Sequence, residues 1–149
     1  MKKVILTIGC LCLFWSVTMS QTPAYFDIVG KWKVVGGEFN TPKPLTKAIE
    51  KQIKVFKELF FHSVFVFQAD HNFNFNIAIT EMKIQKGHWK YNENKNRYVI
   101  QDWKDKDKNN SDLMDIEMKR DGDKTYFVLP TDDELPGFSI KLEVVKMIE

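Results

Sequence analysis

Along most of the chain, apolar and polar residues alternate with a period of two, which is the pattern of β-strands with one buried face. The clearest example is the segment 72–79, where Phe73, Phe75 and Ile77 alternate with asparagines. Further strands are predicted at 27–37, 64–67, 82–91, 97–103, 113–119, 124–129 and 138–147. About eight strands at this spacing predict a mainly β protein, an antiparallel up-and-down barrel that closes on itself.

One segment has the period of a helix instead. Its apolar residues recur at spacings of three and four, with lysines and glutamates between them: Leu45, Ile49, Ile53, Phe56 and Phe60. This predicts one amphipathic helix over 44–60, directly after the first strand. The apolar stripe needs a partner, either across one mouth of the barrel or along its outer wall. We expect the helix to act as a cap.

The alternation also predicts which side chains share the barrel interior. The inward set shifts at Gly87, where we predict a bulge. The candidate ligand-binding residues are Phe73, Phe75, Ile77, Trp89, Tyr91, Met114, Ile116 and Met118. An eight-stranded barrel is just wide enough either to pack itself or to hold one small ligand. The sequence leaves both open, although the methionines favour an adaptable pocket.

Residues 1–20 have the composition of a secretory signal peptide. A basic start and an apolar run over 4–17 precede small residues and a cleavage site before Gln21. We therefore expect export, to the periplasm or beyond the cell, and one domain over 21–149. Lipid attachment at Cys10 would leave only about half of the usual apolar run before the cysteine, so we expect simple cleavage.

Loss of this segment changes the charge and the cysteine count. The chain has 22 Lys and Arg against 20 Asp and Glu, and the excess consists of Lys2 and Lys3. The remaining domain is formally neutral and has no basic run to neutralise nucleic-acid phosphates. Cys10 and Cys12 also lie in the segment, so we expect no disulfide and no thiolate ligand.

Patterns that indicate catalysis or metal binding are absent from the sequence. His62, His71 and His88 lack the spacing of metal ligands, and no cysteine of the exported domain can join them. No Gly-x-Ser-x-Gly, His-Glu-x-x-His or phosphate-binding loop occurs. We therefore expect no catalytic residue, no metal and no cofactor. The lysine-rich helix indicates at most a peripheral contact with a membrane.

The motif Gly30-Lys31-Trp32 opens the first predicted strand. The glycine permits close backbone approach, and the tryptophan fills the closed end of a barrel. With the eight-strand meander, this motif resembles the lipocalins, and more closely the short bacterial lipocalin-like domains. Phe67-x-x-Asp70-His71-x-Phe73 and Gly87-His88-Trp89 resemble further motifs of that family. The resemblance implies a barrel with a cavity for a small hydrophobic molecule, a lipid for example, and structural roles for Gly30 and Trp32.

The chain departs from the larger lipocalins in several features. It lacks the Thr-Asp-Tyr turn and the C-terminal helix. It also lacks an arginine near the end to stack on Trp32, a place that only Lys141 or Lys146 could partly fill. The helix after the first strand is longer than a lid loop and resembles the helical cap of fatty-acid-binding barrels.

The leading hypothesis is an exported, monomeric, non-enzymatic carrier of a small hydrophobic molecule. The alternative is a non-catalytic protein interaction module, an inhibitor or an envelope adaptor, that uses the loops 104–111 and 130–137. An enzyme on the same barrel would need inward-facing acid or base groups, for which His88 and Asp102 are the candidates.

Overall fold

The structure, a computed structural model, describes residues 24–41, 44–130 and 138–148. The predicted signal segment 1–20 lies outside the described residues. So does the predicted loop 130–137, apart from its first residue.

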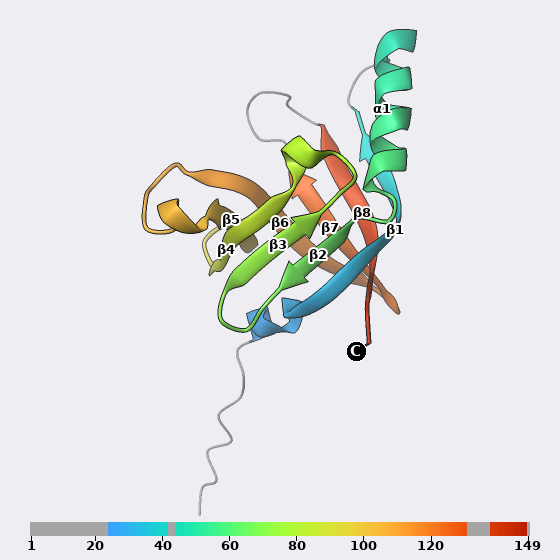
Figure 1. Ribbon diagram of the computed structural model, residues 1–149. Helices are drawn as coiled ribbons and strands as arrows, with labels where there is room; N and C mark the ends of the chain where they lie inside the picture. The colour runs from blue at the N-terminus through green and yellow to red at the C-terminus, as the bar shows by residue number, and fades with distance from the viewer. Residues whose placement is uncertain (1–23, 42–43, 131–137, 149) are drawn as a thin grey trace, which may run out of the picture.

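Eight antiparallel strands form the body of the protein. They are β1 (Gly30–Asn40), β2 (Val64–Phe67), β3 (Asn72–Asn76), β4 (Ile84–Asn92), β5 (Arg97–Asp102), β6 (Asp112–Asp121), β7 (Lys124–Pro130) and β8 (Ser139–Lys146). Each strand pairs with the next along the chain, and β8 returns to pair with β1, so the sheet closes (Figure 1). The predicted up-and-down barrel is confirmed.

Helical segments account for most of the differences from the predicted strand bounds. They are η1 (Ala24–Ile28), α1 (Lys47–Phe60), η2 (Thr80–Met82) and η3 (Trp103–Asp105). The prediction that Trp103 ends a strand is wrong, because the Asp102 carboxylate accepts a hydrogen bond from Lys104 N at 2.9 Å and turns the chain into η3. The first strand begins at Gly30, after η1, and continues past Gly37 to Asn40 because Gly36 and Gly37 both pair with β8.

The helix α1 begins three residues later than predicted. Thr46 has an extended backbone, and its side chain accepts a hydrogen bond from Ile49 N at 3.4 Å. A threonine oxygen in this position satisfies one of the free N–H groups of the first turn, so the helix begins after Thr46. Pro44 therefore precedes the helix and does not occupy its first turn.

The helix does not lie across the barrel mouth. In Figure 1 it stands beyond the barrel, beside the far end of β1. Only its last residue, Phe60, is buried, whereas Ile49 and Phe56 remain 44% and 41% exposed. The expectation that α1 covers the opening is therefore wrong for this conformation. The helix forms one side of the rim, and its apolar stripe packs against the barrel only at its C-terminal end.

The opposite end of the barrel is closed by η1 and Trp32. Trp32 is 4% exposed, and its Nε1 donates a hydrogen bond to Ile28 O at 2.6 Å. Lys146 Nζ lies 5.3 Å from the centre of the Trp32 ring, so Lys146 is the lysine that contacts this tryptophan. Gly30 has a φ of 140°, which a residue with a Cβ rarely adopts, and this explains the glycine before the tryptophan.

Tyr98 ties the barrel wall to η1. Its hydroxyl donates a hydrogen bond to Tyr25 O at 2.9 Å. Burial raises the pKa of Tyr98 to about 12, and the nearby Tyr91 acts in the same direction. The hydroxyl therefore keeps its proton at neutral pH and serves as a donor that holds η1 under the barrel.

Candidate functional site

All eight predicted ligand-binding residues face the barrel interior. Phe73, Phe75, Ile77, Trp89 and Ile116 belong to the buried core, while Tyr91, Met114 and Met118 are partly buried and pack against it. The alternation therefore identified the inward faces correctly. The structure distributes these side chains over the whole length of the barrel, so they do not form a single lining.

Aromatic rings fill the middle of the barrel. Phe65 and Phe75 stack with ring centres 4.5 Å apart, and Phe67 meets Phe73 at 4.8 Å. Phe127 reaches both β2 rings from the opposite wall, with its ring centre 5.4 Å from that of Phe65 and 6.0 Å from that of Phe67. All five side chains are at most 1% exposed. At this level of the barrel the described residues form a packed core, and such interlocked rings leave little room for a ligand.

Sequence reasoning missed several members of this core. Phe65 and Phe67 were only part of a run that is apolar on both faces, and Phe127 follows a hairpin far along the chain. Their burial depends on the closure of β1 against β8, which brings distant strands face to face. Their regular alternation is the only signal in the sequence that could have placed them inward.

Two of the predicted lining residues belong to the closed half of the barrel. Tyr91 stacks on Tyr25 of η1 with ring centres 5.4 Å apart. Met118 pairs across the ladder with the buried Phe127. Neither residue lies near the open end, so both support the closed end of the core.

Partly buried apolar side chains cluster at the open end. Each lies close to the open-end terminus of its strand, or in the η2 connection: Phe39, Met82, Ile84, Met114 and Ile140. We call these five residues the mouth set. They pack against the core on one side, and the structure describes no complete cover on the other. Met114 is the only predicted candidate among them.

The apolar stripe of α1 meets the core beside the mouth set. The Phe60 ring lies 6.0 Å from that of buried Phe75, and Phe56 follows one turn back with its ring 6.4 Å from that of Phe60. Ile53 and Ile49 continue the same helix face toward solvent at helical spacing. Lys57 Nζ lies 5.6 Å from the Phe39 ring, which places a cation at the rim. The stripe is thus a continuous apolar path from the core to solvent.

The loop 104–111 is attached to the barrel wall. Gln101 on β5 is 1% exposed, and its Nε2 donates hydrogen bonds to Lys108 O, Ser111 Oγ and Asp112 Oδ1 at 3.2, 3.2 and 2.9 Å. These bonds fold the loop back over the outer face of β5. The loop residues themselves are exposed or partly exposed, so Gln101 anchors a solvated loop through one buried amide.

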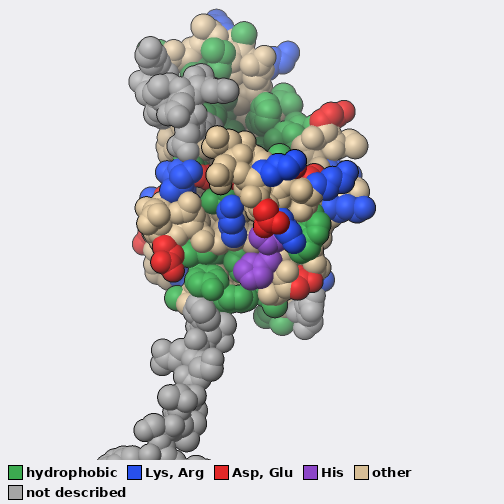
Figure 2. Space-filling model, turned by 90° about the vertical axis from the view of Figure 1, so that its left-hand side faces the viewer, with side chains coloured by type: hydrophobic (Ala, Val, Ile, Leu, Met, Phe, Trp, Pro, Cys, Tyr) green, Lys and Arg blue, Asp and Glu red, His purple; other side chains and the backbone are tan. Residues whose placement is uncertain are grey.

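His88 lies on the same outer wall and does not face the interior. Its ring stacks on His71 at 5.8 Å and meets the edge of Trp103 at 5.2 Å. Its Nδ1 is buried and has no hydrogen-bond partner among the described residues. Figure 2 shows histidine side chains on this face, with basic and acidic groups around them. Burial lowers the pKa of His88, and His71, Lys106 and Lys90 lower it further against an opposing effect of Asp107.

This shift makes stability pH-dependent. Because the pKa of His88 is lower in the folded state than its ordinary value of 6.5, the unfolded chain binds the extra proton more readily. The contribution of neutral His88 to the free energy of unfolding is fully present above pH 6.5 and is lost as the pH falls toward the folded-state pKa. We expect the loss of Tm between pH 7.5 and pH 5 to be smaller in His88→Gln than in the wild type. The exposed His62→Asn is the control, and an equal loss in both variants would contradict the assignment.

In comparisons with known proteins, the chain matches no protein-family model, no curated protein and no solved structure. The class of protein therefore follows from the topology itself: a closed, eight-stranded, antiparallel up-and-down barrel with one helix after β1, which is consistent with a lipocalin-like fold. No helix among the described residues is long and apolar enough to cross a membrane. In the same residues, no three potential ligand side chains come together around a metal position.

Proposed function

We propose that this protein is an exported, non-catalytic binding protein that takes up an anionic amphiphile, such as a fatty acid, at the open end of its barrel. The observation that carries this proposal is the continuous apolar stripe from Phe75 through Phe60 and Phe56 to Ile49. An acyl chain laid along it would cover apolar surface that the fold leaves in water, and each buried methylene contributes about 0.8 kcal/mol.

The charge at the rim supports an anionic head group. Lys57 lies at the junction of α1 and the mouth set, and Lys54 is one turn back on the helix. A carboxylate there would gain a charge-assisted contact without entering the core. This site differs from the deep cavity of the sequence hypothesis, because the ligand rests above the packed rings.

The alternative function, a protein interaction module, remains a second prediction. The structure bears on only one of the two loops that this function would use. Residues 104–111 are held against the wall by Gln101, and residues 131–137 lie outside the described part of the chain. The stripe on α1 would also suit a partner protein, so a binding measurement must separate the two functions.

Binding of 11-(dansylamino)undecanoic acid, measured by dansyl fluorescence, tests the proposal. We expect saturable binding by the wild type and an affinity at least about tenfold lower in Phe56→Asp, since the new carboxylate disrupts the stripe and repels the head group. Val145→Asp is the matched control, because Val145 is 53% exposed on β8, away from the mouth. No saturable binding, or equal affinity in the two variants, would refute a lipid site at the mouth.

A further inference from the structure

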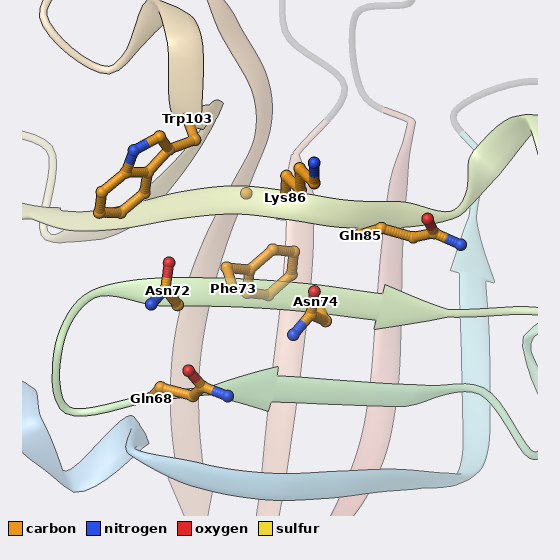
Figure 3. Close-up of a pocket in the computed structure, with 8 residues that line it drawn as sticks. Gln68, Asn72, Phe73, Asn74, Gln85, Lys86 and Trp103 are labelled. Atoms are coloured by element: carbon orange, nitrogen blue, oxygen red, sulfur yellow. The ribbon is translucent and has the colours of Figure 1, made fainter.

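A hollow of about 240 Å³ lies on the outer wall of the barrel. It opens where the pairing of β3 and β4 is interrupted. Phe73 pairs with Gly87 and Phe75 with Ile84, so Gln85 and Lys86 on β4 together face the single residue Asn74 on β3. This is the arrangement of a β-bulge, which spreads two strands apart and redirects side chains. Figure 3 shows Phe73, Asn74, Gln85 and Lys86 around the hollow.

The bulge is fixed by its neighbours, so the hollow is preformed. A Cβ on Gly87 would lie 2.9 Å from side-chain atoms of both Phe73 and Ile84, which leaves room only for glycine. The Asn74 side-chain amide, assigned in the orientation opposite to the one drawn in Figure 3, donates hydrogen bonds to the carbonyl oxygens of Gln85 and, at 3.2 Å, of Phe73. The Asn74 side chain thereby replaces ladder hydrogen bonds that the bulge removes.

Unused amide groups surround the hollow. The side chains of Gln68 and Gln85 make no hydrogen bond within the part of the chain that the structure describes. The Asn72 side-chain amide donates one hydrogen bond to Asp70 Oδ2 at 2.6 Å, and its carbonyl oxygen stays available as an acceptor. Each primary amide offers both donors and an acceptor. A sugar hydroxyl is likewise both a donor and an acceptor, so an amide can either donate a hydrogen bond to it or accept one from it.

An exposed tryptophan stands at one end of the hollow (Figure 3). Trp103 is 38% exposed, unlike Trp32 and Trp89, which are buried in the barrel. Lys106 Nζ lies 4.5 Å from its ring centre, and His88 meets its edge, so neighbours on the outer wall hold the ring. A flat apolar ring face at the edge of a polar hollow matches the C–H face of a sugar ring.

We propose that this hollow binds a pyranose sugar, with its hydroxyls on the amides and its apolar face against Trp103. Among the residues that the structure describes, Lys86 is the one charged side chain lining the hollow, and none of them brings a carboxylate to its lining. An acidic sugar, whose carboxylate can reach Lys86, therefore fits better than a neutral one. A nucleobase would also stack on Trp103, but its edge presents only about two or three hydrogen-bonding groups to amides that lie on several strands.

This proposal concerns a different face from the mouth, so neither site depends on the other. The test is a glycan array carrying neutral and uronic-acid oligosaccharides, followed by calorimetric titration of the strongest glycan, with uridine monophosphate as competitor. We expect the wild type to bind, and Trp103→Ala and Gln85→Ala each to bind at least about tenfold more weakly. Gln52→Ala, the same substitution on exposed α1, should bind like the wild type.

Three outcomes would overturn the proposal. The array could show no glycan bound by the wild type. The titrations could show that Trp103→Ala and Gln85→Ala keep wild-type affinity for the bound glycan. Uridine monophosphate could bind to the hollow more tightly than any glycan, which would make it a nucleotide site. Urea unfolding curves that show both variants fully folded under the titration conditions ensure that a loss of binding reports on the hollow and not on the fold.

Discussion

Trp89→Ala is expected to lower the free energy of unfolding by about 3–5 kcal/mol, the usual loss for a fully buried tryptophan. Trp89 has no exposed surface, and its ring contacts Phe26, Phe67 and Tyr98. Its Nε1 also donates a hydrogen bond to Gln68 O at 2.8 Å. Truncation therefore leaves a large void and removes the donor to a backbone carbonyl. Urea unfolding should show this loss, with a Tm lower by roughly 10–20 °C.

Trp103→Ala is the matched control, because the same atoms are removed from a ring that is 38% exposed. We expect it to cost about 1 kcal/mol or less, as is usual for surface positions. If Trp89→Ala cost no more than Trp103→Ala, the interior would not be tightly packed. A deep ligand cavity among the eight inward residues would then become the better description.

Gly30→Ala is expected to have the second largest effect, about 2–3 kcal/mol, because its φ of 140° lies in a region that strains a residue with a Cβ. The added methyl group would also lie 2.5 Å from Lys146 Cε and displace the lysine from the Trp32 ring. Strain and the lost cation–π contact therefore act together at the closed end. Thermal and urea unfolding measure the combined loss of stability from the backbone strain and the lost cation–π contact.

Gly36→Ala provides the comparison for Gly30. Gly36 also lies on β1, but its φ is not in the positive region, and the nearest atom to an added Cβ is 3.6 Å away. We expect a change within about 0.5 kcal/mol. Equal losses of unfolding free energy in the two variants would show that a Cβ at either glycine position destabilises β1. They would contradict the special role assigned to Gly30 at the closed end.

The strands and the inward faces were predictable because the alternation of apolar residues is a local property. Phe73 and Phe75 lie on the same face of β3 as soon as the strand forms. From the sequence, two lysines near the end of the chain, Lys141 and Lys146, were candidates for the contact with Trp32. The choice between them depends on the β1–β8 register, which pairs Trp32 with Lys146.

The packed interior could not be predicted in the same way. Whether eight inward faces enclose a cavity depends on the summed volume of side chains from opposite walls, such as Phe65 and Phe127. The outer hollow depends on a bulge whose pairing places two residues of β4 opposite Asn74. The sequence indicated a bulge near Gly87, but it carried no information on which side chains would gather around it.

The position of α1 also depends on tertiary contacts. The stripe predicted a helix with one buried face, and the structure buries only Phe60 at its end. Helix periodicity shows which residues share a face, but not how much of that face a neighbour covers. The exposed remainder is the reason that the proposed lipid site lies at the rim.

Methyl-labelled methionine gives the most direct test of where a ligand binds. Met82 and Met114 belong to the mouth set, whereas Met118 packs in the closed half beside Phe127. NMR spectra recorded during titration with a fatty acid should show shifts of the Met82 and Met114 methyl signals, with the Met118 signal unchanged. Shifts of Met118 as large as those of Met114 would place the ligand deep in the barrel and contradict the packed core. No shift of any methionine would contradict the lipid site itself.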